Sequence, residues 1–150
     1  MARIKYHNKR EYLDFYAQAA AARYGKRIGK MGVDALIPVP VHPSKMRTRG
    51  FNQAGILAEK IGEILELPVY SDCLKRSRKT EPQKNLSPRE RFKNLEHAFA
   101  AEAMPAGVRS VMLIDDIYTT GSTIEACTRA LRKNTIENVY FLTICIGYGK

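Results

Sequence analysis

The sequence has no tryptophan, only three cysteines and no long apolar run. The cysteines are far apart and form no C-x-x-C pair, which argues against a structural zinc site or a disulfide framework within this chain. The richest apolar run, Val139 to Ile146, has the length of a strand, whereas a membrane-spanning helix needs about 20 apolar residues. The N-terminal residues are basic but lack the apolar core of a secretory signal. A cytoplasmic location is therefore expected.

Acidic residues are scarce in two parts of the chain. Residues 1–30 hold eight basic and two acidic residues, and residues 40–93 hold twelve and six, so each part carries a net charge of +6. The rest of the chain is slightly acidic. This asymmetry favours a polyanionic partner, either nucleic acid or a phosphate-rich ligand. A solvated basic surface that aids solubility is the alternative interpretation.

The 150 residues fit one domain, and 45% hydrophobic and 27% charged residues exclude gross disorder. Strands alternate with helices along the chain, which predicts a mostly parallel α/β sheet without a second domain. The first helix is expected to stop at a glycine-rich break over 24–32, and the last strand is expected at the centre of the sheet. Helices are predicted over 9–23, 52–65 and 123–133, strands over 34–41, 68–74, 96–100, 108–114 and 139–147, and a long basic loop over 75–93.

An apolar strand runs directly into Asp115 and Asp116, and a turn of hydroxyl residues around Gly121 then leads into a helix. Ligands of open α/β sheets bind beyond the carboxyl ends of the strands, and backbone N–H groups at a helix N-terminus attract anions. Gly121 would let the backbone approach a phosphate closely. The two carboxylates would accept hydrogen bonds from neutral hydroxyls, such as a ribose diol, or help to hold Mg²⁺ through water. A plain strand-to-helix turn, with Asp and Thr side chains as caps, is the alternative. Ser122 or Thr123 is the expected N-cap of the helix.

The segment VMLIDDIYTTGST at 111–123 resembles the phosphoribosyl pyrophosphate (PRPP) signature of the type I phosphoribosyltransferases. Three other stretches resemble the ComF (ComFC) family of competence proteins: PVPVHPSKMRTRGFNQA at 38–54, TEPQKNLSPRERFKN at 80–94 with Ala98-Phe99, and IKYHNKREYLDF at 4–15. The resemblance implies the type I phosphoribosyltransferase fold, a mostly parallel sheet flanked by helices. It also implies a small N-terminal hood within residues 1–30.

By this resemblance, Asp115 and Asp116 would be the catalytic pair that binds the ribose hydroxyls. Mg²⁺ would bridge pyrophosphate oxygens and sugar hydroxyls, without direct side-chain ligands and with most of its waters retained. The 5′-phosphate would lie against Tyr118, Thr119, Thr120, Gly121, Ser122 and Thr123. The pyrophosphate would be neutralised by Lys45, Arg47 and Arg49, and the loop that closes over PRPP would contribute Arg78, Lys79, Gln83, Arg89 and Arg91. For Arg49 and the 75–93 loop, an ordinary solvated loop is the alternative.

The sequence departs from the family pattern in two features, the zinc module and the acceptor pocket. ComF proteins commonly begin with a four-cysteine zinc module, which this chain lacks, and the acceptor pocket of base-using relatives has no clear counterpart. A hood could offer Tyr6, His7, Tyr12 and Tyr16 for stacking on a base, although these residues could equally belong to the core.

Three functions remain open at this point. The chain could be a ComF-like PRPP-binding protein that assists the handling of single-stranded DNA in natural competence, with a helicase-like ATPase and the DNA-uptake machinery as partners. It could be an active phosphoribosyltransferase of nucleotide salvage or synthesis with an unidentified acceptor. It could also sense PRPP without turning it over. Members of the superfamily often form dimers, so a homodimer is a further candidate state.

Overall fold

A computed structural model of the chain describes residues 10–41, 46–47, 50–76, 87–90, 93 and 97–147. Its centre is a parallel sheet with the strand order β1-β4-β5, and a short antiparallel pair, β2 and β3, lies beside it. The strands are β1 (Ala35–Pro38), β2 (Leu74–Arg76), β3 (Phe99–Ala101), β4 (Ser110–Tyr118) and β5 (Asn138–Ile146). The helices are α2 (Arg10–Lys30), α4 (Gln53–Leu65) and α6 (Ser122–Arg132). The predicted parallel α/β sheet with flanking helices is confirmed.

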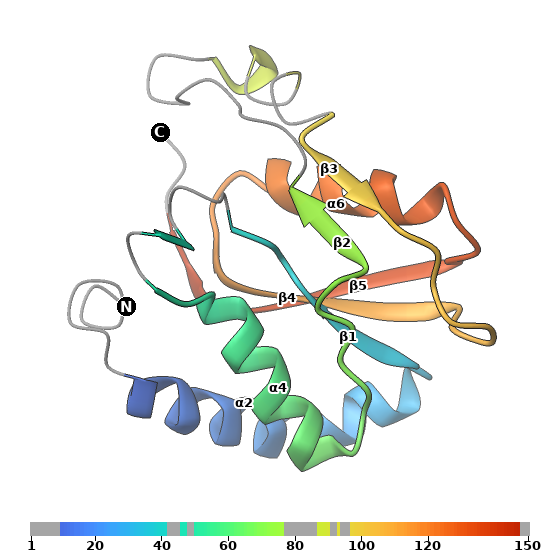
Figure 1. Ribbon diagram of the computed structural model, residues 1–150. Coiled ribbons are helices and arrows are strands. Elements are labelled where there is room, and N and C mark those ends of the chain that lie inside the picture. The colour runs from blue at the N-terminus through green and yellow to red at the C-terminus, as the bar shows by residue number, and fades with distance from the viewer. Residues whose placement is uncertain are drawn as a thin grey trace.

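Each face of the parallel sheet is covered by a different layer (Figure 1). Helices α2 and α4 cover the lower face in this view, and α6 with β2 and β3 covers the upper face. Because side chains of a strand alternate between faces, Val111 and Leu113 of β4 pack in the cluster on the α6 side. Met112 and Ile114 pack with α2 and α4. Burial on both faces explains why β4 begins as a continuous apolar run.

The predicted break after residue 23 is wrong, because α2 continues without interruption to Lys30. Ile28 is 3% exposed and belongs to the core cluster that α2 shares with α4. A Cβ atom on Gly25 would lie 3.0 Å from Cδ2 of Leu65, so the missing side chain allows the two helices to approach closely. Gly25 therefore serves packing rather than termination.

The prediction of a strand over 68–74 is also wrong. Only Val69 forms an isolated parallel bridge there, with Leu36 of β1, and the strand β2 begins at Leu74. Lys75 and Arg76, assigned to the long loop from the sequence, belong to β2.

Strand β5 lies at one edge of the described sheet and not at its centre as predicted. None of its residues is fully buried, and Phe141 and Ile146 are exposed. Its apolar composition therefore reflects partial burial against both helix layers. Val139 packs on the α6 side, and Tyr140 and Leu142 pack on the α4 side.

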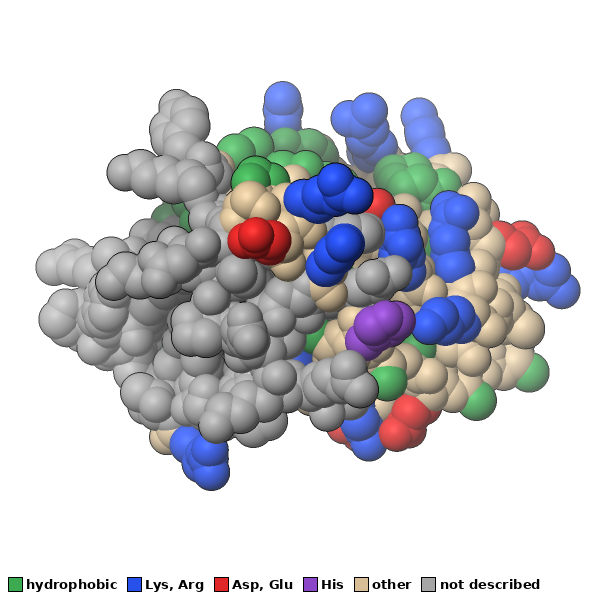
Figure 2. Space-filling view, turned by 90° about the horizontal axis from the view of Figure 1, so that it is seen from above, with side chains coloured by type: hydrophobic (Ala, Val, Ile, Leu, Met, Phe, Trp, Pro, Cys, Tyr) green, Lys and Arg blue, Asp and Glu red, His purple; other side chains and the backbone are tan. Residues whose placement is uncertain are grey.

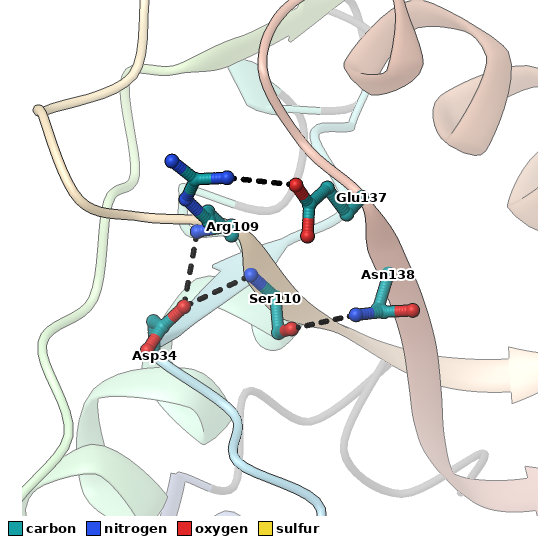
Figure 3. A network of polar contacts seen from close by, with 5 residues as sticks. All are labelled: Asp34, Arg109, Ser110, Glu137 and Asn138. Carbon is teal, nitrogen blue, oxygen red and sulfur yellow. Dashed lines mark hydrogen bonds and ion pairs between the residues drawn. The ribbon is translucent and has the colours of Figure 1, made fainter.

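The amino ends of the strands are joined by a network of polar contacts (Figure 3). The Asp34 carboxylate accepts hydrogen bonds from the backbone N–H groups of Arg109 and Ser110, at 3.0 and 2.9 Å. Asn138 donates to the Ser110 hydroxyl at 3.0 Å, and the Arg109 guanidinium pairs with Glu137 at 2.8 Å. These contacts fix β1, β4 and β5 in register at the end of the sheet opposite to Asp115 and Asp116.

Among the helices that the structure describes, none combines the length and the hydrophobicity that a membrane crossing requires. The first of them, α2, lies along α4 within the helix layer of the lower face (Figure 1). Residues 1–9 lie outside the described residues, so a hood within residues 1–30 stays a prediction.

Candidate functional site

The residues predicted between Asp115 and Thr123 lie at the carboxyl end of β4. The strand was predicted to end at residue 114, before the two acids. It instead continues through Asp115 and Asp116 to Tyr118. A short turn with exposed Thr119 and Thr120 then leads into α6. Strand, turn and helix thus follow one another in the predicted order, but the carboxylates lie within the strand.

The N-terminus of α6 is formed by Gly121 and not by the predicted Ser122 or Thr123. Gly121 has a φ of 85°, a left-handed conformation that favours glycine. As a glycine it offers no side chain to cap the helix, and the Thr120 hydroxyl accepts a hydrogen bond from the Ser122 N–H at 3.4 Å. The Thr120 and Ser122 hydroxyls lie 2.9 Å apart and bond to one another. The N-terminal N–H groups of α6 together with these hydroxyls form a region suited to an anion.

Tyr118 lies directly over this turn. A Cβ atom added to Gly121 would be 2.7 Å from the Tyr118 hydroxyl oxygen, so any other residue here would require the tyrosine side chain to shift. The Tyr118 ring stacks on Phe141 of β5, with ring centroids 5.3 Å apart and an angle of 8° between the planes. The aromatic pair thereby ties the turn to the neighbouring strand.

A small cavity opens between the turn and the end of β4. Its volume of about 20 Å³ suffices for about one water molecule, so a larger ligand has to rest at its mouth. The cavity is lined by Asp115, Ile117, Tyr118, Thr119, Gly121, Thr123 and Ile124. Five of the predicted PRPP-binding residues therefore share one cavity, and Asp116 is not among them.

Asp115 and Asp116 face different layers. The pKa of the Cys127 thiol in α6 is raised, first by burial and second by the negative charge of the Asp115 carboxylate. Asp115 therefore lies on the α6 side. Asp116 follows Met112 and Ile114 in the alternation of β4, so it faces the α4 side, where it is 9% exposed. A ligand in contact with both carboxylates would have to lie across the end of β4.

Arg76 of β2 is a candidate that sequence reasoning did not single out. Its guanidinium carbon lies 5.5 Å from the centre of the Phe99 ring, and burial lowers the pKa of the guanidinium. Arg76 and Asp115 each influence the pKa of Cys127, so all three lie in one neighbourhood on the α6 side. In the sequence, Arg76 is one basic residue among many, and only the pairing of β2 with β3 distinguishes it.

Two of the predicted basic residues, Arg47 and Arg89, are among the described residues. Arg47 is exposed and lies in a single helical turn with Met46. Arg89 is exposed in a short helical segment, which starts with a reciprocal pair of hydrogen bonds between Ser87 and Glu90. The other predicted residues lie outside the described part of the chain, namely Lys45, Arg49, Arg78, Lys79, Gln83 and Arg91, together with Tyr6 and His7.

The two described hood tyrosines pack into the protein. Tyr12 and Tyr16 are half-buried and lie against a small cluster made by Leu13 and Phe51. Of the two interpretations left open by the sequence, the structure supports core packing for these two residues.

Lys and Arg side chains stand out on the face that carries α6 (Figure 2). The last turn of α6 contributes Arg129 and Arg132, followed by the exposed Lys133. Acidic residues interrupt this basic face, since Glu125 pairs with Arg129 at 3.5 Å. The described part of the chain has no group of three His, Cys, Asp or Glu side chains that could hold a metal ion.

Comparison with known proteins gives relatives with competence and DNA-utilization names. The chain is 35% identical to Competence protein F of Haemophilus influenzae over 122 residues, 79% of this chain and 53% of that protein. It is 34% identical to the DNA utilization protein YhgH of Escherichia coli O157:H7 over 75% of this chain and 49% of that protein. Competence protein ComFC of Bacillus subtilis is 33% identical over 64% of this chain and 37% of that protein. The chain thus spans about half the length, or less, of these relatives.

Among solved structures, the purine phosphoribosyltransferase of Pyrococcus horikoshii superposes with a TM-score of 0.53. The match covers 89% of this chain and 82% of that one at 12% sequence identity, and it shows that the two share a fold. No model of a known protein family matches the chain.

Proposed function

We propose, from the premise that this chain is a homologue of the ComF competence proteins with a phosphoribosyltransferase fold, that it binds PRPP at the carboxyl end of β4. The observation that carries the proposal is the N-terminus of α6, where Gly121 stands at the N-cap without a side chain, next to the two carboxylates near the end of β4. N–H groups and hydroxyls suit the 5′-phosphate, and carboxylates suit the ribose hydroxyls.

The sugar would lie across the end of β4. Asp115 would accept a hydrogen bond from one ribose hydroxyl on the α6 side, and Asp116 would accept one on the α4 side. Mg²⁺ would be carried mainly by phosphate oxygens and water. Bound in this way, Mg²⁺ would supply positive charge to the pyrophosphate.

Transfer from PRPP requires no nucleophilic side chain. The anomeric centre gains positive character as the bond to pyrophosphate breaks, and fixed cations stabilise the charge that grows on the leaving group. Of Lys45, Arg47 and Arg49, the cations predicted to neutralise the pyrophosphate, Arg47 is the one that the structure describes, and it is exposed. The carboxylates would hold the ribose in place and lie close to the positive charge that develops on it.

We also propose that the protein handles single-stranded DNA, with the competence helicase-like ATPase and the DNA-uptake machinery as partners. Support comes from the competence and DNA-utilization names of the relatives and from the basic residues on the α6 face (Figure 2). Phosphate contacts by Lys and Arg make such binding strongly dependent on salt. A phosphoribosyltransferase that transfers the sugar to an acceptor of nucleotide metabolism is the alternative, and the fold shared with a purine enzyme favours it.

Calorimetry tests both parts of the proposal. PRPP with Mg²⁺ is titrated into the protein, alone and with a single-stranded oligonucleotide present. Saturable binding of PRPP is expected, and an affinity that changes with the oligonucleotide would link the site to DNA. Absence of PRPP binding would overturn the proposed site. Pyrophosphate release that requires both Mg²⁺ and an added base would favour the transferase.

The DNA surface is tested separately by its salt dependence. Replacing Arg129, Arg132 and Lys133 by Ala should weaken oligonucleotide binding and lower the slope of log affinity against log salt by about 1 for each phosphate that is no longer neutralised. The matched control replaces Lys26, Arg27 and Lys30 by Ala, which removes three exposed positive charges from α2 in the opposite layer. If the triple variant and the control bind DNA equally well, the α6 face is not the DNA surface.

A further inference from the structure

Three polar side chains are buried among the described residues: Gln53, Ser110 and Asp116, with exposed fractions of 1%, 8% and 9%. Ser110 receives a hydrogen bond from Asn138 at the amino end of the sheet. Gln53 differs, because neither its Nε2 nor its Oε1 atom has a hydrogen-bond partner among the described residues. A buried amide without partners costs free energy, and each such group calls for an explanation.

Hydrogen bonds place the start of α4, where Gln53 lies, at the same end of the sheet as Asp116. The preceding residue, Asn52, caps α4 and donates from Nδ2 to the Val39 carbonyl oxygen at 3.3 Å. The Val39 N–H in turn donates to the carbonyl oxygen of Ile114 in β4 at 2.9 Å. Asp116 is two residues beyond Ile114, on the same face of the strand.

The packing of α4 gives the same placement. Gln53, Leu57 and Ile61 follow one another at intervals of four residues, so they lie along one face of the helix. Leu57 and Ile61 are fully buried in the cluster that contains Met112 and Ile114 of β4. Gln53 continues this face towards the carboxyl end of β4, where Asp116 follows Ile114.

We propose that Gln53 is a positioning residue for Asp116, an inference that rests on the PRPP site proposed above. An ionised carboxylate only accepts hydrogen bonds, and the Nε2 group of a glutamine only donates them. When the ribose draws the Asp116 carboxylate towards its hydroxyl, Gln53 donates to the second carboxylate oxygen and holds the group in that orientation. The amide that has no partner in the free protein thereby gains one in the complex.

The substitution Gln53→Met tests this assignment, because methionine has a similar shape but no polar atoms. We expect the free protein to be at least as stable against urea as the wild type, since a buried unpartnered amide is removed. We expect its affinity for PRPP with Mg²⁺, measured by calorimetry, to fall by about tenfold or more, the value of one hydrogen bond to a charged group. Leu57→Met, one turn further along the same face, is the matched control and should leave affinity unchanged.

A double-mutant cycle separates coupling to Asp116 from a general effect on the site. In the Asp116→Ala background, Gln53→Met should cause no further loss of affinity for PRPP. In the Asp115→Asn background, it should lower the affinity by the same factor as in the wild type. Equal affinities of wild type and Gln53→Met, or full additivity with Asp116→Ala, would overturn the role of Gln53 and leave the proposed function intact. A wild type that does not bind PRPP would overturn the proposed function and this inference with it.

Discussion

Asp115 and Asp116 are adjacent in the chain, yet they face opposite layers of the molecule. Asp115 lines the cavity beside Gly121 and contributes to the raised pKa of Cys127 in α6. Asp116 is instead buried on the side of α4. The cause is the continuation of β4 to Tyr118, since successive side chains of a strand point to opposite faces. The two carboxylates therefore have different surroundings, with α6 beside Asp115 and α4 beside Asp116.

Replacing Asp115 by Asn should weaken the binding of PRPP with Mg²⁺ by about tenfold or more, because a neutral amide loses the charge-assisted hydrogen bond to a ribose hydroxyl. The double variant with Asp116→Asn should bind more weakly still. Calorimetry measures both, and Asp34→Asn at the opposite end of the sheet serves as the control. Unchanged affinity of the double variant would show that the carboxylates do not hold the sugar.

Gly121→Ala should destabilise the protein and weaken ligand binding. The new Cβ would lie 2.7 Å from the Tyr118 hydroxyl oxygen, in a backbone conformation with a φ of 85°, and such strain costs about 1–3 kcal/mol. Gly107→Ala is the matched control, because its φ of 92° brings the same backbone strain without any atom within 4 Å of the new Cβ. Urea denaturation should show the greater loss for Gly121→Ala, and only that variant should lose affinity for PRPP. Equal losses of stability would mean that Tyr118 moves aside freely.

Two glycines within helices should respond to alanine in opposite directions. Gly29→Ala should stabilise the protein by about 0.5–1 kcal/mol, since the position is open and alanine favours the helix. Gly62→Ala should destabilise it by about 1–3 kcal/mol, because the new Cβ would lie 2.7 Å from Cγ2 of Val69 and 2.8 Å from the Leu67 carbonyl oxygen. Thermal or urea unfolding measures both variants. A stable Gly62→Ala variant would contradict the close packing of α4 against the segment that follows it.

Stability should fall in acid partly because of Asp34. The hydrogen bonds from the backbone N–H groups of Arg109 and then Ser110 lower the pKa of Asp34 from its ordinary value of 3.8. A carboxylate whose pKa is lower in the folded protein stabilises the fold above its unfolded pKa, and this contribution is lost as the pH falls through the folded pKa.

Asp34→Asn should therefore destabilise the protein at neutral pH, by less than about 1 kcal/mol because the group is exposed, and should make little difference near pH 2. Urea denaturation across this pH range provides the measurement. Glu137→Gln is the comparison, since it breaks only the exposed ion pair with Arg109 and should change the stability less. An Asp34→Asn effect that is the same at both pH values would exclude the linkage.

Much of the fold was predictable because it depends on local patterns. The apolar run before Asp115 and the hydroxyl turn around Gly121 predicted a strand followed by a helix, and the homologues named competence proteins confirm the resemblance to the ComF family. The predicted helix over 52–65 is also observed, and Asn52 caps it: the Asn52 Oδ1 atom accepts the Ala54 N–H at 3.1 Å.

Only the tertiary structure decided features that depend on contacts between distant segments. Gly25 looks like a helix terminator in sequence, yet α4 packs against it and α2 continues. The apolar residues of β5 suggest a central strand, but residues anywhere in a sheet that are half-buried on both faces have the same composition.

For the site, the sequence by itself determined which groups can bind a phosphate and a diol, because hydroxyls, glycine and carboxylates carry that chemistry in any fold. Their arrangement came from tertiary structure. The length of β4 separated Asp115 from Asp116, the pairing of β2 with β3 brought Arg76 to the α6 side, and the packing of α4 buried Gln53 at the Asp116 end of the sheet. Such placement depends on the burial of apolar faces across the whole chain, which no single motif records.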